Sequence, residues 1–161
     1  MTSDDLNRSL TVLLRELTYG APLDAAFVLN RGDAGLLASL DALSAADASQ
    51  SRDGGASIAA HVDHLRYGLS LMNRWAAGEN PFTDADWSRS WEIGAVSERE
   101  WNRLRDRLRD EVERWLVALE SPRQVTGIEL DGVVASVIHL GYHLGAIRQI
   151  HPSARGPKAN D

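Results

Sequence analysis

The chain has 161 residues, of which 43% are hydrophobic and 25% are charged, and its net charge at pH 7 is −6. This size fits one domain with a substantial core, and the acidic balance argues against nucleic acid, because phosphate binding needs a basic face. Cysteine is absent, which excludes disulfides, thiolate metal sites and cysteine nucleophiles. Histidine and carboxylate are the strong metal ligands that remain.

The N-terminus is acidic and lacks an apolar leader, so no signal peptide is predicted. No apolar run approaches the ~20 residues of a membrane span. We therefore expect a cytoplasmic protein with no membrane partner.

The sequence of the N-terminal third predicts two helices. Apolar residues at helical spacing predict the first over residues 6–17, capped by Ser3 or Asp4 and ended near Pro22. Residues 23–29 form either a helical turn or an irregular cover. Asp33 is expected to cap a shorter helix through Leu43, and the small, polar residues 45–55 predict a loop.

The second long helix is predicted over residues 57–77, with Gly78 as its C-terminal glycine. A long connection follows, and its two tryptophans, Trp87 and Trp91, are unusual for a loop. They either plug one end of the core or wall a pocket.

The C-terminal half predicts two more long helices. Ser97 caps the third long helix, whose acidic first turn suits the helix dipole and which ends at Ser121-Pro122. Residues 125–130 suggest a short extended piece, and a turn at 131–132 leads into the last helix.

These elements predict an all-α protein, a four-helix bundle with one additional short helix. The bundle would occupy residues 1–151, and residues 152–161 would form a flexible tail. Bundles build their sites from side chains on facing helices.

The last predicted helix carries His139 and His143, four residues apart. Such residues lie one turn apart on one face of a helix and can close on a single metal ion. Two packed histidines without an ion are the alternative. His61 and His64 on the second long helix are the candidates for a third ligand, and spacing alone does not choose between them. His151 lies beyond the helix end and is interpreted as a surface residue.

Residues 59–65 (AAHVDHL) and 139–145 (HLGYHLG) together resemble the DinB-like (damage-inducible) superfamily of metal-binding four-helix bundles. That family pairs a histidine, often followed by leucine, on its second helix with an H-x-x-x-H motif on its fourth. His64 with Leu65 matches the first element, and the histidine pair with Gly145 matches the second. The chain departs from the pattern at Ala146, where glutamine is common, and in its extra histidine, His61.

The resemblance implies that His64, His139 and His143 hold a divalent metal ion, with zinc or nickel expected, although imidazole ligands alone do not fix the metal. No catalytic residue is singled out. The candidate pocket residues are His61, Tyr67, Trp75, Trp87, Trp91 and Tyr142. Candidate acids are Asp84 and Asp86, and candidate anion-binding residues are Arg66 and Arg148, each of which is also interpretable as an ordinary structural or surface residue.

Relatives in this superfamily include metal-dependent thiol-S-transferases, a mycothiol-dependent isomerase and hydrolases. The resemblance therefore implies an enzyme of the thiol-S-transferase or hydrolase type that acts on a small-molecule substrate or thiol, and a homodimer. The alternative is a non-catalytic, metal-stabilised module for small-ligand binding or stress response. A helical interaction domain without a metal site is a further alternative, but it would require the match of the histidines to the family pattern to be a coincidence. Ferritin-like and zinc-protease chemistry are excluded, because Glu-x-x-His and H-E-x-x-H motifs are absent.

Overall fold

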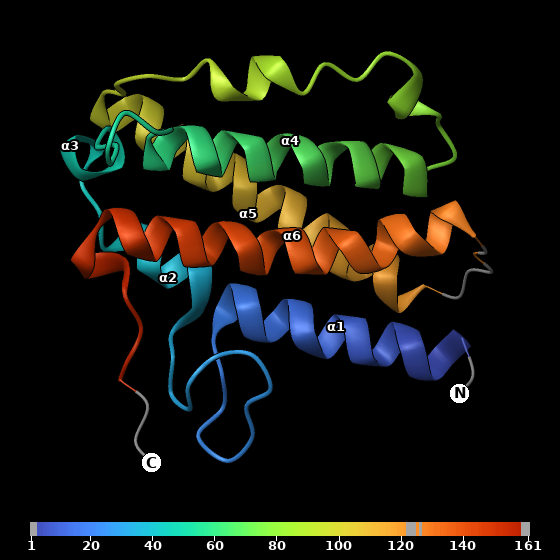
Figure 1. Ribbon diagram of the computed structural model, residues 1–161. Helices are drawn as coiled ribbons and strands as arrows, with labels where there is room; N and C mark the ends of the chain where they lie inside the picture. The colour runs from blue at the N-terminus through green and yellow to red at the C-terminus, as the bar shows by residue number, and fades with distance from the viewer. Residues whose placement is uncertain (1–2, 122–124, 126, 159–161) are drawn as a thin grey trace.

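The computed structural model describes residues 3–121, 125 and 127–158, and the described part is all-helical (Figure 1). Four long helices form the bundle: α1 (Ser3–Tyr19), α4 (Ile58–Ala76), α5 (Glu98–Glu120) and α6 (Ile128–Ile150). The shorter elements are α2 (Gly35–Asp41), α3 (Ala45–Ala48) and the 3-10 turns η1 (Pro81–Thr83), η2 (Ser88–Trp91) and η3 (Pro152–Ala154). The predicted all-α bundle is confirmed, with two short α-helices where one was expected. Two predictions lie outside the described residues: capping of the first helix by the side chain of Ser3 or Asp4, and the end of the third long helix at Pro122.

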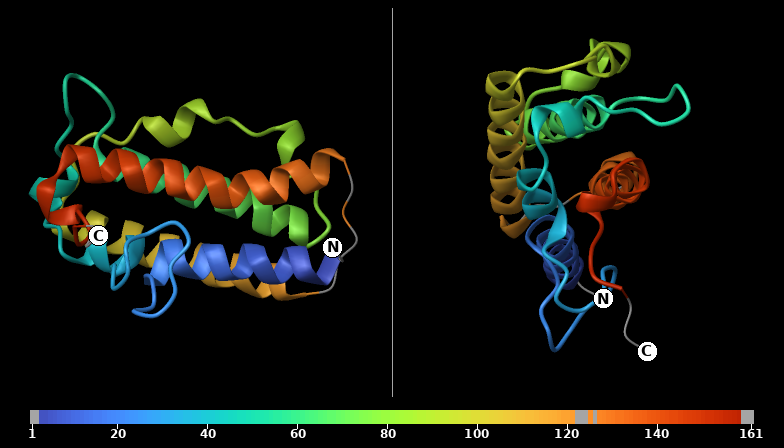
Figure 2. Two further views of the ribbon diagram at one scale, coloured as in Figure 1. Left: turned by 60° about the horizontal axis from the view of Figure 1, so that its bottom comes forward. Right: turned by 90° about the vertical axis from the view of Figure 1, so that its left-hand side faces the viewer.

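The connection between α4 and α5 is a long segment rather than a tight hairpin. α5 packs against α4 and α1, and α6 packs against the same two helices from the opposite side (Figure 2). α4 and α5 run in the same direction, so the chain between them returns along the outside of α4, carrying η1 and η2 (Figure 1). α6 runs antiparallel to α4. This long return segment covers the part of α4 that carries the histidines.

The ends of α4 and α5 follow the predicted signals. The Ser57 hydroxyl accepts a hydrogen bond from the Ala60 N–H at 3.1 Å, and Gly78 follows the helix with a φ of +95°. Ser97 and Glu100 form a reciprocal capping box at the start of α5. α5 therefore starts directly after the predicted cap Ser97, and α4 starts one residue after the predicted first residue, Ser57.

Two buried tryptophans of α5 fix that helix within the core. The indole N–H of Trp101 donates to the Leu43 carbonyl at 2.9 Å, and that of Trp115 donates to the Ser136 hydroxyl of α6 at 3.0 Å. Each bond satisfies the polar group that a buried tryptophan brings into a core. α5 is thereby joined both to the segment after α2 and to α6.

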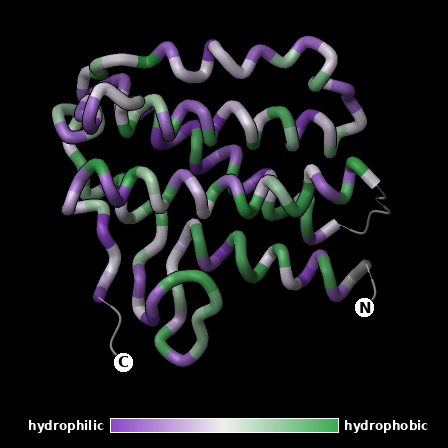
Figure 3. Tube along the Cα trace, viewed as in Figure 1, coloured by the Kyte–Doolittle hydropathy of each residue, from purple (hydrophilic) through white to green (hydrophobic). Residues whose placement is uncertain are grey.

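The irregular segment between α1 and α2 is held by one buried carboxylate. Glu16 is 3% exposed and accepts hydrogen bonds from the backbone N–H groups of Phe27, Val28 and Leu29 at 2.7–3.1 Å. The apolar character of this loop is visible in Figure 3, although the Phe27 side chain is exposed. Glu16 therefore holds the middle of the loop, while backbone hydrogen bonds of Ala21 with Gly32 and Asp33 join its two ends.

Glu16→Ala is expected to lower the free energy of unfolding by about 2 kcal/mol, because it leaves several partly buried N–H groups without their acceptor. Urea unfolding measures the change. The control is Glu120→Ala, which removes only an exposed ion pair with Arg15 and should cost less than about 1 kcal/mol. Equal losses in the two variants would contradict the assigned role of Glu16.

The segment after α6 contacts the bundle over its described residues, 152–158. Ala154 is fully buried, and its carbonyl accepts a hydrogen bond from Arg148 at 3.1 Å. The Asn30 side chain donates to the Pro157 carbonyl at 2.8 Å. Arg148 also pairs with the buried carboxylate of Asp33 at 2.7 Å, so residues 152–158 are joined to the loop before α2 through Arg148 and Asn30.

Two local predictions are wrong. The segment expected as a loop over residues 45–55 begins with α3, which a reciprocal capping box between Ser44 and Asp47 starts. α6 begins at Ile128. The second half of the predicted extended piece (residues 128–130 of 125–130) and the whole predicted turn (131–132) are therefore helical. Gly132, read as a turn residue, lies inside the helix.

In the described part, α6 alone is long and apolar enough to cross a membrane, contrary to the sequence-based expectation. His139 and His143 interrupt the apolar run of α6, but the mean hydropathy of the helix stays high enough for a membrane span. The helix packs against α4 and α1, and about a third of its most apolar 18-residue window is buried. Core helices of bundles share this length and composition.

Candidate functional site

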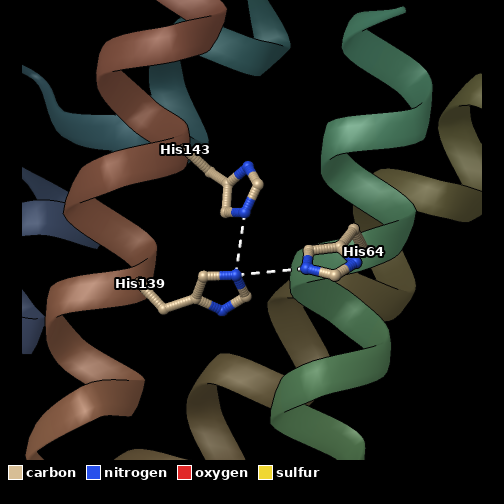
Figure 4. A group of neighbouring side chains, drawn as sticks. All are labelled: His64, His139 and His143. Atoms are coloured by element: carbon tan, nitrogen blue, oxygen red, sulfur yellow. Dashed lines mark hydrogen bonds between the residues drawn. The ribbon is translucent and has the colours of Figure 1, made fainter. Parts of the chain in front are cut away.

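Three histidines from two antiparallel helices meet on the side of the bundle between α4 and α6 (Figure 4). The Nε2 atoms of His64 and His139 lie 3.1 Å apart, and those of His139 and His143 lie 2.8 Å apart. One potential ligand atom from each residue lies within 4.8 Å of the other two. The structure therefore brings together the three residues that the sequence singled out.

These distances suit a single metal ion. Two nitrogens bound to zinc at about 2.0–2.1 Å lie about 3.3 Å apart at a tetrahedral angle and about 2.9 Å apart at a right angle. The observed separations of 3.1 and 2.8 Å fall close to these values. Three imidazoles form a donor set found in catalytic zinc sites, which keep a further position open. The cluster could hold a metal ion, and the donor set does not fix which one.

Ser90, on the return segment, fixes the orientation of His64. The Ser90 hydroxyl is 2.7 Å from the Trp87 carbonyl, to which it donates its proton, and it is 2.8 Å from Nδ1 of His64. Nδ1 of His64 must therefore carry the proton and donate to Ser90, which leaves the Nε2 lone pair directed at the cluster. Sequence reasoning missed Ser90, because a serine in a loop 26 residues from His64 gives no recognisable signal.

Ser90→Ala is expected to weaken metal binding by about 10- to 100-fold, because it removes the acceptor that holds the His64 ring and its tautomer. Competition titration with a chelating dye measures the affinity. The matched control is Ser88→Ala in the same short turn, whose hydroxyl contacts Asp86 rather than a histidine. A similar affinity for both variants would show that Ser90 does not support the site.

His61 lies behind His143 rather than within the cluster. Its Nδ1 is 2.8 Å from Nδ1 of His143, whereas the cluster is approached by Nε2 of His143. The two nitrogens lie at different positions of the imidazole ring, so His61 contacts the ring away from the other ligands. If His143 binds an ion through Nε2, its Nδ1 carries the proton and donates to His61.

Burial keeps the histidines of the site neutral. Burial, with smaller effects of His139 and His61 and an opposing effect of Asp63, lowers the pKa of His64 to about 4. Burial, followed by the neighbouring histidines, lowers the pKa of His143 to about 3. Burial also lowers the pKa values of His61 and His139. Neutral imidazoles at pH 7 are the form that binds metal.

Aromatic side chains form one wall of the site. Trp91 stacks on His64 with ring centroids 4.1 Å apart, and it meets His61 edge-on at 5.4 Å. Trp87 lies 5.5 Å from His64, next to Gly68, where an added Cβ would come within 3.4 Å of the Trp87 ring. The absence of a side chain at Gly68 therefore lets Trp87 lie close over α4.

Of the other predicted pocket residues, Tyr142 contacts the cluster, whereas Tyr67 and Trp75 lie farther from it. Tyr142 meets His143 edge-on at 5.0 Å and is 70% exposed. Tyr67 packs edge-on against Trp87, and its hydroxyl accepts the backbone N–H of Asp86 at 2.9 Å. Trp75 lies farther along α4, in a groove adjoining the site.

Three of the four charged candidates have other partners, and the fourth, Asp84, is exposed. Arg66 pairs with Asp63 at 2.6 Å, and Arg148 pairs with Asp33. The carboxylate of Asp86 accepts hydrogen bonds from the backbone and hydroxyl of Ser88. His151 lies outside the cluster, 3.2 Å from the Asp47 carboxylate, as the sequence indicated. The described contacts give none of these side chains a place against the three imidazoles.

Two adjoining grooves lie between α4, α6 and the return segment. The site groove, of about 410 Å³, is lined by His64, His139 and apolar residues that include Leu69 and Trp87. The end groove, of about 960 Å³, lies farther from the histidines and is lined by Trp75 and Ile128 among others. Met72, Phe82, Gly132 and Ala135 line both grooves.

Fold and site together define a helical-bundle protein with a three-histidine cluster suited to metal binding. A sequence profile of the DinB superfamily matches residues 29–147, which is most of the chain. The chain belongs to the DinB superfamily, a metal-binding family, as its two histidine motifs suggested. Searches of curated proteins and of solved structures returned no match.

Proposed function

We propose that this protein is a metal-dependent enzyme of the thiol-S-transferase or hydrolase type, with His64, His139 and His143 as the metal ligands and zinc or nickel as the ion. The observation that carries the proposal is the convergence of three Nε2 atoms next to an apolar groove. A site of this kind leaves one side of the ion accessible to a small molecule.

Of the two reactions, thiol transfer fits the surroundings better. The side chains placed against the three imidazoles are those of His61, Ser90, Trp87, Trp91 and Tyr142. None of these is a carboxylate that would serve as a general base for water. A thiol that coordinates a metal is deprotonated without a base, so a small thiol is the nucleophile that this site favours.

The reaction would join the thiol sulfur to an electrophilic carbon. The bond from that carbon to its leaving group breaks, and the thiol proton leaves with the departing group. When bound, a divalent ion supplies the positive charge that lowers the pKa of a thiol or water on its open side.

The chain's own residues hold the ligands and limit solvent. Ser90 orients His64 through Nδ1, and with an ion on Nε2 of His143, His61 would accept a hydrogen bond from the Nδ1–H of His143. Trp91 covers one face of His64, and Trp87 approaches it from the return segment. Covering the ligand rings with apolar side chains strengthens the electrostatic effect of an ion in the site.

Metal content and activity test the proposal in sequence. Elemental analysis of protein without a histidine tag is expected to give about one equivalent of metal per chain. The loaded protein is then mixed with 1-chloro-2,4-dinitrobenzene and cysteine, glutathione or 2-mercaptoethanol, and, separately, with 4-nitrophenyl acetate. Acceleration by the wild type, lost in His64→Ala, is the expected result.

The alternative is a non-catalytic, metal-stabilised binding module. It is favoured because the described contacts place no carboxylate against the imidazoles. Stoichiometric metal with no turnover in either assay would select this alternative. A protein that takes up no zinc or nickel would contradict both. The homodimer and the cytoplasmic location stay predictions, and sedimentation velocity tests the first of them.

A further inference from the structure

We propose that the site groove and the end groove form one binding channel for the apolar body of the substrate, whose reactive head lies at the three histidines. The substrate class is then an elongated, largely uncharged molecule with a thiol or other metal-binding head and a hydrocarbon or aromatic extension. This inference rests on the proposed function for the head of the substrate, but its evidence comes from a different part of the molecule.

The first observation is that the two grooves share walls on three sides. Met72 of α4, Phe82 of η1, and Gly132 and Ala135 of α6 line both of them. We name these four residues the throat. Because the throat residues come from α4, α6 and the return segment, the grooves meet along a common passage rather than at one shared side chain.

The length of the channel follows from the helices that form it. His139 and Ile128 lie eleven residues apart on α6, as do His64 and Trp75 on antiparallel α4. Eleven residues of helix span about 16 Å. Both helices therefore extend from the histidines to the far end of the end groove. A molecule lying along them reaches well beyond the space that a small hydrophilic thiol fills.

The chemistry of the walls favours an apolar occupant. Between the histidines and the end groove, the walls are formed by Leu65, Leu69, Met72 and Phe82 among others, and Trp75 and Ile128 follow. The end groove also has polar lining residues, which are Asn80, Glu79, Glu129 and Asp131, and Glu79 is paired with Arg74. Two of these apolar side chains face solvent, with Phe82 46% and Ile128 83% exposed. A bound hydrocarbon chain would cover them, which is favourable in proportion to the apolar area removed from water.

Gly132 provides a direct test of the throat. A Cβ built on Gly132 meets nothing within 4 Å, and the same is true of Gly145 on the same helix. Gly132 lines both grooves, whereas Gly145 is exposed and lines neither. Gly132→Leu would place a side chain in the throat, and Gly145→Leu would not. Both variants replace a helical glycine by a better helix former, so both are expected to fold.

The test uses full-length, metal-free protein and the uncharged fluorophore N-phenyl-1-naphthylamine, displaced by ethanol, 1-butanol, 1-hexanol and 1-octanol. Affinity is expected to rise about three- to fourfold per methylene. Gly132→Leu should weaken the binding of 1-octanol at least about tenfold and leave the affinity for 1-butanol nearly unchanged. Gly145→Leu should behave as the wild type. No dependence on chain length, or equal behaviour of the two variants, would overturn the channel.

The position of the head is tested with the cobalt(II)-loaded protein and the corresponding 1-alkanethiols, by the absorption band of a sulfur–cobalt bond. 1-Octanethiol is expected to bind more tightly than ethanethiol in the wild type, and Gly132→Leu should remove most of that difference. Equal affinities for the two thiols would overturn the link between channel and site. Failure of cobalt to bind, with chain-length-dependent alcohol binding intact, would count against the proposed function and leave the apolar channel established.

Discussion

His143→Ala is expected to weaken zinc binding by more than about a hundredfold, because loss of a direct ligand should exceed the effect of losing a supporting group. The remaining nitrogens of His64 and His139 come from different helices and would form a two-ligand site. Elemental analysis after dialysis and competition with a chelating dye measure the change. Near-stoichiometric zinc in the wild type and almost none in the variant is the expected result.

The same substitution should remove metal-dependent stabilisation. Zinc at a free concentration of 100 times its Kd stabilises a protein that binds it only when folded by about 2.7 kcal/mol. We expect this gain in urea unfolding of the wild type and not of His143→Ala. His151→Ala, eight residues farther along and outside the cluster, is the control and should keep both metal and stabilisation. Equal zinc binding in the two alanine variants would contradict the assignment of His143 as a ligand.

Mild acid is expected to destabilise the metal-free protein. The pKa of His64 is lowered to about 4 and that of His143 to about 3, whereas a histidine in an unfolded chain titrates near about 6.5. As the pH falls below about 6.5, the unfolded state takes up protons before the folded state does. Stability should therefore fall by up to about 1.4 kcal/mol per pH unit for each of these histidines.

Urea unfolding in the presence of a chelator, at pH values from about 7.5 to about 5, measures this slope above the range where most carboxylates titrate. His143→Gln removes one of the four histidines with a lowered pKa and should make the curve less steep, by up to about 1.4 kcal/mol per pH unit. A wild-type curve without slope in this window, or an unchanged slope in the variant, would contradict the lowered pKa values.

The main features of the fold and the histidine cluster could be predicted because their signals are local. Helical spacing of apolar residues located the start of α4 to within one residue, and Ser97, predicted as a cap, located the start of α5. The i, i+4 spacing of His139 and His143 placed them on one helix face, and the family pattern added His64. Each signal occupies a few consecutive residues, and tertiary packing did not override it.

The supporting parts of the site could not be predicted, because they depend on the path of the chain between helices. Ser90 reaches His64 only because the return segment runs back along α4. The relation of His61 to His143 depends on the rotation of α4 about its axis, which residues three apart do not define. The early start of α6 was hidden by an Asp-Gly pair that usually indicates a turn, and the residues added there line the end groove.

The position of the ligands along the chain determines when in folding the site can form. His139 and His143 meet on one helix, but His64 lies 75 residues before His139 and reaches it only when α4 and α6 have docked. Closing so long a loop is an entropic cost that early, local structure cannot offset. Zinc should therefore slow unfolding while leaving the rate of refolding nearly unchanged. Tight metal binding would mark the completion of folding rather than its start.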